Sequence, residues 1–197
     1  MNIDTVDQPK SNPILIMVRG VPGGGKSYVT AKLVEAIGEE NVVVLDPDAI
    51  DKTSKEYIAL SESLTREDVN ENLHPYRFLR SKAYQGIETN KIIIWNQGFM
   101  DLDGFNKTVI NLTSYALDHS TMIPTLVVEV EVNGETSKKR IADRVARGGH
   151  DVPEEVLKRF IDQYRSFADE GYNVVTVDGE GDVDVSVAAI TQALNSL

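Results

Sequence analysis

The sequence predicts an α/β fold in which a five-stranded parallel sheet lies between two layers of helices. Five short apolar runs are rich in β-branched residues and nearly uninterrupted, as expected for strands covered on both faces. Helix-like stretches alternate with these runs along the chain. The 197 residues are enough to bury one full core of this kind.

The elements follow one another in regular order. The strands are predicted over residues 14–18, 42–45, 92–95, 126–132 and 174–177. The helices are predicted over about 27–37, 54–60, 72–89, 105–118, 136–147, 153–170 and 183–195. Residues 1–13 are polar, so we expect a flexible leader before a single domain over residues 14–197. Ligands in such folds bind beyond the carboxyl ends of the strands, where we expect the functional residues.

A glycine-rich loop follows the first predicted strand and precedes a predicted helix. Residues 20–27 read GVPGGGKS and match the pattern G-x-x-x-x-G-K-[ST] at every fixed position. Backbone N–H groups can curl around an anion at four glycines, Gly20, Gly23, Gly24 and Gly25. Lys26 can reach the β- and γ-phosphates, and the Ser27 hydroxyl can ligate Mg²⁺. The loop therefore predicts a nucleoside triphosphate site, with ATP and Mg²⁺ as cofactors.

The second and third predicted strands both end in polar residues. Asp46-Pro47-Asp48 follows the second strand, where we expect Asp46 to hold Mg²⁺ through water and Asp48 to act as the base. A polar turn that caps the next helix is the alternative. Asn96-Gln97 follows the third strand, where many phosphate-loop proteins carry an acidic residue. This pair could bind phosphate, water or an acceptor, or could pin the following loop.

Residues 140–159 read RIADRVARGGHDVPEEVLKR and predict a lid over about 136–160. Arg140, Arg144 and Arg147 share one helical face, two glycines permit a hinge, and Pro153 opens a second helix. A lid of this kind can close on bound nucleotide, with Arg144 as a catalytic group that neutralises the transferred phosphoryl group. A solvated arginine face is the alternative. His150, at the hinge, is assigned no role.

A second basic pair lies near the start of the helix predicted over 72–89. Arg77 and Arg80 are one turn apart. They could meet an anionic acceptor, or they could belong to an ordinary amphipathic helix, and the sequence favours neither reading.

Composition excludes several classes of function. The absence of cysteine excludes disulfides, thiolate metal sites and cysteine nucleophiles. Asp and Glu outnumber Lys and Arg by 31 to 20, which argues against extended nucleic-acid binding and favours a small or strand-end acceptor. No apolar run approaches the ~20 residues of a membrane helix, and the leader lacks the order of a secretory signal. We therefore expect a cytoplasmic protein with no membrane partner.

Taken together, these motifs resemble the small P-loop kinases, which include zeta-toxin-like kinases and the kinase domain of bacteriophage polynucleotide kinase. The resemblance rests on GVPGGGKS, on the D-x-D after the second strand and on RVARGGHDVPEEVLKR. It implies the three-layer α/β/α P-loop NTPase fold, and it implies that Arg144 and Arg159 point toward the nucleotide. It also supports the roles given above to Lys26, Ser27 and Asp48. The chain departs from zeta-type kinases after the third strand, where WNQGFMD replaces the Glu and Arg that hold their acceptor.

The function predicted from the sequence is that of an ATP-dependent kinase. It would move the γ-phosphate of Mg–ATP to a hydroxyl of a nucleotide-like, nucleic-acid-end or other small acceptor. Arg140 and Arg147 would join Arg144 and Arg159 on the nucleotide. A nucleotide-binding switch or an ATPase without an acceptor is the alternative, although Asn90-Lys91 lacks the Asp of a guanine-reading motif because Ile93 stands in its place.

Overall fold

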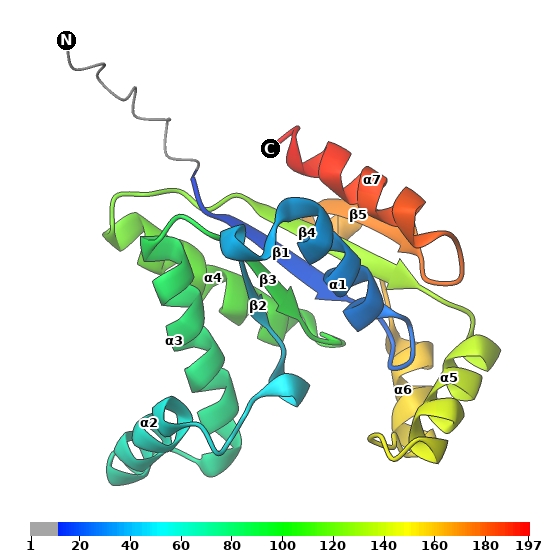
Figure 1. Cartoon of the computed structure of the whole chain (residues 1–197), viewed down its shortest axis with the longest axis horizontal. Coiled ribbons are helices and arrows are strands. Elements are labelled where there is room, and N and C mark those ends of the chain that lie inside the picture. The colour runs from blue at the N-terminus through cyan, green and yellow to red at the C-terminus, as the bar shows by residue number, and fades with distance from the viewer. Residues whose placement is uncertain (1–11) are drawn as a thin grey trace.

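A parallel sheet of five strands forms the centre of the protein, which a computed structural model describes from residue 12 to residue 197 (Figure 1). The predicted leader lies, up to residue 11, outside the described residues. The strands stand in the order β2-β3-β1-β4-β5, and all neighbouring pairs are parallel. Their bounds are β1 (Ile14–Arg19), β2 (Val42–Leu45), β3 (Ile92–Asn96), β4 (Thr125–Glu131) and β5 (Asn173–Asp178).

Helices cover both faces of the sheet, and the alternation of side chains along β1 shows how. Leu15 and Met17 pack toward α3 (His74–Glu88) and α4 (Leu102–Asp118). Ile16 and Val18 point to the other face, toward α1 (Lys26–Ile37) and α7 (Val183–Leu194). Both cores consist largely of aliphatic side chains that are fully buried. The predicted three-layer α/β/α fold is therefore confirmed.

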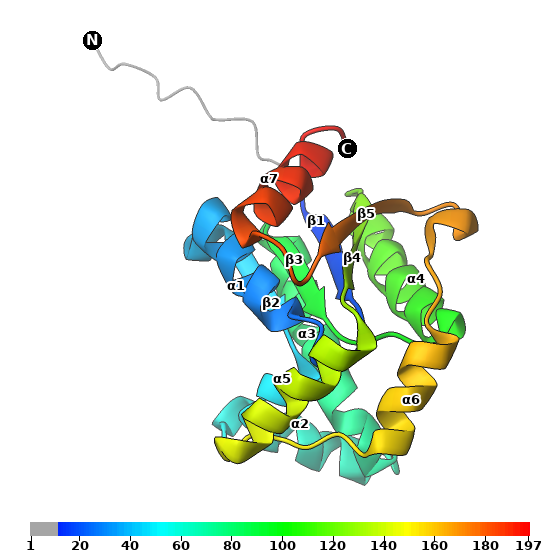
Figure 2. The ribbon, with the colours of Figure 1, turned by 90° about the vertical axis from the view of Figure 1, so that its right-hand side faces the viewer.

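Three further helices lie beyond the carboxyl ends of the strands, namely α2 (Lys55–Arg66), α5 (Gly134–Ala146) and α6 (Glu154–Gln163). Figures 1 and 2 both show the α5–α6 pair below this edge of the sheet, with α2 beyond the same edge beside the first turns of α3. These helices therefore frame the edge at which ligands bind in folds of this type. Within residues 12–197, no helix combines the length and apolar character needed to cross a bilayer.

Two predicted helices differ from the structure by more than three residues at one end. The helix predicted over 54–60 begins after Ser54, whose hydroxyl accepts a hydrogen bond from Tyr57 N, and continues to Arg66. The helix predicted over 153–170 stops at Gln163. Residues 164–167 form no regular element, because buried side chains of β1 and β4 bind their backbone, as described below.

Candidate nucleotide site and acceptor cavity

The glycine-rich loop connects β1 to α1 and curls tightly at its centre. Gly23 has φ +74°, and a Cβ there would lie only 2.7 Å from Ser137 O. A side chain at this position is therefore excluded both by backbone conformation and by space. Gly20 and Gly24 lie at the base of the loop, and both are buried. Gly25 precedes the first residue of α1, so the loop leads directly to the N–H groups at the helix N-terminus.

Lys26, the first residue of α1, folds back over the loop. Its Nζ donates to Gly20 O and to Val21 O, at 2.9 Å each. Burial lowers the pKa of Lys26 to about 8, although the carboxylates of Asp46 and Asp48 act in the opposite direction. The ammonium group is thus held at the mouth of the loop by two carbonyl oxygens, which phosphate oxygens can replace.

Asn96 joins the glycine loop to the end of β2. Its Nδ2 donates to Ser27 Oγ at 3.1 Å and to Asp46 Oδ2 at 2.8 Å. Asp46 Oδ1 in turn accepts from Asp48 N at 2.9 Å, which fixes the turn that carries Asp48. The Oδ1 atom of Asn96 is buried and has no hydrogen-bond partner among the described residues. In the corner formed by Ser27, Asp46 and Asn96, the Oδ1 atom of Asn96 is therefore available to a ligand.

One cavity of about 560 Å³ brings most of the predicted site residues together. Its walls include the loop residues Gly23, Gly25, Lys26 and Ser27 and the carboxylates of Asp46 and Asp48. Asn96, Gln97, Arg144 and His150 also belong to the polar lining. Residues from five separate parts of the chain, Tyr76 of α3 among them, thus surround a space next to the phosphate-binding motif.

The predicted arginines of the lid lie at different places. Arg140 and Arg144 line the cavity, and Arg140 also donates to Gly179 O at 2.9 Å and to Gly23 O at 3.4 Å. Arg147 is exposed and donates to Asp143 O of its own helix, at 3.0 Å. Arg159 is exposed as well. Neither Arg147 nor Arg159 lines the cavity in this structure.

A smaller cavity of about 300 Å³ adjoins the first one and was not predicted from the sequence. It shares Gly25, Tyr28 and Arg140 with the larger cavity, and its other walls include Gly179 and Val183. Gly179 belongs to the loop after β5, and a Cβ there would lie 2.3 Å from Gly24 O. This close contact between two loops forms a pocket at the outer side of the phosphate loop. In the sequence, only the two glycines after the last strand, Gly179 and Gly181, could have indicated a tight loop at this place.

A third cavity, of about 560 Å³, lies on the other side of Asp48. Pro47, Asp48 and Tyr76 line both this cavity and the one beside the glycine loop. Its remaining walls come from the turn before α2, from α2 itself, from the short turn 71–73 and from the start of α3. They include Lys52, Tyr57, Ser61, Asn72 and His74. Asp48 therefore lies between the cavity beside the glycine loop, called the phosphate cavity below, and a second, polar cavity.

His74 and the two arginines of α3 have structural surroundings. His74 is buried, with Nδ1 2.8 Å from Ser61 Oγ and Nε2 3.0 Å from Val69 O, so it joins α2 to α3. Arg77 is exposed and Arg80 is half-buried, and neither lines the cavities next to Asp48. The residue of this helix that reaches both cavities is Tyr76, to which the sequence analysis gave no role of its own.

The glycine loop, the parallel sheet with β1 at its centre and the paired helices beyond its edge define a P-loop protein with a kinase-like fold. The chain belongs to the AAA domain family, whose model matches residues 15–167. The resemblance to the small P-loop kinases is thereby confirmed.

Solved structures share this fold at low sequence identity. A protein of the PezAT chromosomal toxin–antitoxin system of Streptococcus pneumoniae has a TM-score of 0.61 and 14% identity, with 96% of this chain and 89% of that chain covered. A gluconokinase from Sinorhizobium meliloti 1021 has a TM-score of 0.56 and 14% identity, with 94% of each chain covered. Deoxyadenosine kinase from M. mycoides has a TM-score of 0.53 and 16% identity, with 93% and 100% covered. A comparison with curated proteins gave no significant match.

Proposed function

We propose that this protein is an ATP-dependent phosphotransferase that moves the γ-phosphate of Mg–ATP to a hydroxyl of a nucleotide-like, nucleic-acid-end or other small acceptor. One observation carries the proposal: Asp48 lines both the cavity beside the glycine loop and a separate polar cavity. A carboxylate between a phosphate site and a second ligand site suits a base that deprotonates an acceptor. A nucleotide switch has no need of the second cavity.

In the proposed reaction, the acceptor hydroxyl attacks the γ-phosphorus while its proton passes to the Asp48 carboxylate. The bond from the γ-phosphorus to the β–γ bridging oxygen breaks, and ADP leaves with the electron pair. Lys26 exchanges Gly20 O and Val21 O for phosphate oxygens, and Arg144 stabilises the charge on the group in transfer. Rate enhancement comes mainly from positioning and electrostatics.

The corner formed by Ser27, Asp46 and Asn96 fits a magnesium ion. Its oxygens are of the hard type that Mg²⁺ prefers, and Asn96 Oδ1 is buried and has no partner within residues 12–197. Within the part of the chain that the structure describes, no group of three His, Cys, Asp or Glu side chains could hold a metal by itself. Ser27 and Asp46, with Asn96 beside them, would hold the ion together with the nucleotide phosphates. When bound, Mg²⁺ neutralises charge on the β- and γ-oxygens.

The adjoining smaller cavity is the proposed place of the nucleotide base. It continues from the phosphate cavity past Gly25 and Arg140, and the ring of Tyr28 and the Val183 side chain give it apolar walls. An aromatic base can pack against such walls while its phosphates occupy the glycine loop.

The test is a screen of γ-labelled ATP against sugars, nucleosides, nucleotides and 5′-OH oligonucleotides. The kinases among the similar structures, one for gluconate and one for deoxyadenosine by their names, support including sugars and nucleosides. We expect label transfer to one class of acceptor. Label that appears only as inorganic phosphate would instead support an ATPase, and binding without turnover would support a switch.

The Asp48→Asn variant should lower phosphoryl transfer about a hundredfold or more while ATP binding changes little, because the base is lost and the phosphate loop is kept. Single-turnover transfer and equilibrium ATP binding measure the two effects. Asp118→Asn, on the exposed end of α4, is the matched control and should behave as the wild type. Full transfer by Asp48→Asn would show that another group takes the proton.

A further inference from the structure

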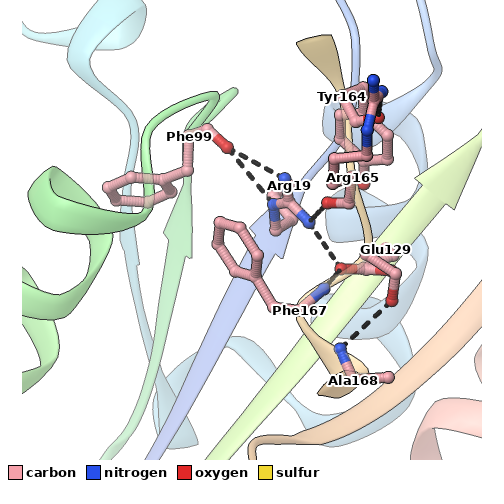
Figure 3. Close-up of polar contacts among 8 residues, drawn as sticks. Arg19, Phe99, Glu129, Tyr164, Arg165, Phe167 and Ala168 are labelled. Atoms are coloured by element: carbon pink, nitrogen blue, oxygen red, sulfur yellow. Dashed lines mark hydrogen bonds and ion pairs between the residues drawn. The ribbon is translucent and has the colours of Figure 1, made fainter. Parts of the chain in front are cut away.

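Arg19 and Glu129 form an ion pair inside the protein (Figure 3). Arg19 is the last residue of β1, Glu129 is its register partner on β4, and neither side chain is exposed. The Nη1 atom of Arg19 lies 2.5 Å from Oε1 of Glu129. Removing two charges from water commonly costs as much free energy as their attraction returns. Stability alone is therefore a weak reason for a buried pair at this place.

The pair binds the backbone of two segments that have no regular secondary structure. Arg19 donates from Nε and Nη2 to Phe99 O, at 3.3 and 3.1 Å, in the loop after β3. It donates from Nη1 to Arg165 O at 2.8 Å. Glu129 Oε1 also accepts from Phe167 N, at 2.8 Å. The pair thus joins the ends of β1 and β4 to the chain that follows α6.

Two aromatic rings of that segment enclose the guanidinium. We call residues 164–167 the exit segment, because they lead out of α6. The Cζ atom of Arg19 lies 3.5 Å from the ring centroid of Phe167 and 4.3 Å from that of Tyr164, as Figure 3 shows. Arginine is attracted to ring faces and its planar fork restricts the geometry of its hydrogen bonds. The exit segment is therefore held at one defined position on the sheet.

The loop after β3 depends on the same arginine. Phe99 has φ +35°, a left-handed conformation that is costly for a residue with a side chain. Its carbonyl receives two hydrogen bonds from Arg19, and its ring packs edge-on against Phe105, with centroids 5.3 Å apart. The two residues directly before Phe99 are Gln97 and Gly98, which line the phosphate cavity. Arg19 thus stabilises a strained loop at the wall of that cavity.

The predicted lid is attached to the core at both of its ends. At the start of α5, Ser137 Oγ donates to Pro22 O of the glycine loop, at 2.6 Å. At the end of α6, Phe160 packs against Gly98, and the exit segment follows. Residues 142–151, between these two attachments, are all exposed. The position of the exposed tip, which carries Arg144 and His150, is therefore set by the attachments.

We propose that Arg19 and Glu129 are positioning residues that set the place of α6 and of the loop after β3 relative to the glycine loop. Neither residue lines the phosphate cavity, so they act through the exit segment and through Phe99. Their effect on phosphoryl transfer rests on the proposed function, whereas their effect on the two segments does not.

The first test is backbone hydrogen exchange of the double variant Arg19→Met/Glu129→Leu. It removes both charges at similar volume and leaves no lone buried charge, so the fold should be kept. The midpoint of thermal unfolding should fall, because Phe99 O, Arg165 O and Phe167 N lose their side-chain partners. Amides of residues 97–99 and 164–170 should exchange about tenfold faster or more, while those of β1 and β4 stay protected. The control Lys32→Met/Glu35→Leu removes an exposed ion pair of α1 and should change neither segment. Unchanged exchange of both segments in the folded double variant would overturn the proposal.

If the double variant does not fold, Arg19→Lys provides the same test. One ammonium group cannot serve Phe99 O, Arg165 O and Glu129 in the geometry of the guanidinium fork. The loop after β3 should then exchange faster although the ion pair is kept, and wild-type exchange there would overturn the proposal.

An ATP analogue separates this proposal from the proposed function. In the wild type, the bound analogue should slow hydrogen exchange at the amides of the glycine loop and of α5–α6. In the double variant, it should slow exchange at the amides of the glycine loop alone. Turnover of that variant should fall about tenfold at an unchanged KM for ATP, since lid placement and not nucleotide binding is affected. Equal protection of α5–α6 in both proteins would overturn the positioning role. If the analogue did not protect the glycine loop of the wild type, the proposed function would be contradicted. The exchange data of the nucleotide-free proteins would still decide the role of Arg19 and Glu129.

Discussion

At the scale of single residues, Asn96 connects three parts of the site. Its amide nitrogen reaches both Ser27 Oγ and Asp46 Oδ2 from the end of β3. A neutral carboxamide can donate to the Asp46 carboxylate, whereas a second carboxylate at this distance would repel it. The absence of an acid after the third strand, visible in the sequence, thus has a physical counterpart in the hydrogen bonds of this corner.

Replacing Asn96 by Asp should destabilise the protein in magnesium-free buffer by about 2 kcal/mol, because two hydrogen bonds are lost and two carboxylates meet. Addition of Mg²⁺ and ATP should recover part of the loss, since a cation relieves the repulsion. Urea unfolding of both proteins, with and without Mg–ATP, measures this. Asn70→Asp, at an exposed capping position before α3, is the control and should stay within ~0.5 kcal/mol of the wild type, because Asp can accept the same hydrogen bond from Asn72 N. Equal stability of Asn96→Asp and the wild type would contradict the assigned hydrogen bonds.

ATP affinity should depend on the charge of Lys26. Burial lowers its pKa to about 8, so the ammonium form predominates below that pH and the neutral amine above it. Phosphate binding requires the charged form, so the Kd for ATP should be flat below pH 8. Above pH 8 it should rise by up to about tenfold per pH unit. Calorimetric titrations from pH 7 to 10 would show this, with proton uptake on binding at the alkaline end. A Kd that does not change across this range would mean that Lys26 does not contact the phosphates.

At the scale of elements, spacing and tertiary contacts contribute different information. Arg140 and Arg144 lie on α5 and line the cavity, whereas Arg147 follows the last residue of this helix and does not line it. The spacing of residues in a helix predicts which of them share one face of the helix, but it does not predict how many of these residues line a cavity. The helix expected to reach residue 170 stops at Gln163, because Arg19, 146 residues away from Arg165 in the chain, binds the carbonyl of that residue. No local pattern contains such a contact.

The loop after β5 is the element that the proposed base pocket depends on most. In Gly179→Ala the new Cβ would lie 2.3 Å from Gly24 O and 2.8 Å from Glu131 O, so the loop must move away from the glycine loop. We expect a Kd for ATP about tenfold or more above that of the wild type, while the affinity for free triphosphate changes little. Competition titrations with the two ligands make the comparison.

The control for this variant is Gly134→Ala at the first turn of α5. The nearest atom to its Cβ is the mobile Ile161 Cδ1, at 3.3 Å, so the helix should tolerate the change or gain slightly from it. If Gly179→Ala bound ATP as tightly as Gly134→Ala, the smaller cavity would not be the base pocket.

At the scale of the whole molecule, the fold could be predicted because its signals are local and regular. Apolar runs such as residues 92–95 mark strands covered on both faces, and their alternation with helices implies parallel order. The smaller cavity at Gly179 and the polar cavity beyond Asp48 could not be predicted in the same way. Each is formed by segments that are distant in the sequence: Gly179 lies against Gly24, and Asp48 and Tyr76 line the same cavity. Only the three-dimensional structure brings these residues together.

The formal charge of −11 also acts at this scale. Long single-stranded RNA should show no measurable binding in filter assays at ~0.15 M salt, because an acidic surface repels a polyanion beyond the reach of the local site. A short 5′-OH oligonucleotide, which needs contact at one end only, is the comparison. Tight binding of the long RNA with a steep dependence on salt would reveal a basic track that the total charge conceals.

Trp95 has a practical consequence. It is the chain's one tryptophan, it is only 2% exposed, and its indole Nε1 donates to Gln97 Oε1 at 3.0 Å. Gln97 lines the phosphate cavity, so a ligand that draws the amide away also changes the surroundings of the indole. The unlabelled protein thus contains its own fluorescent reporter, whose emission can follow the filling of the cavity in real time with any ligand that does not absorb in the same range.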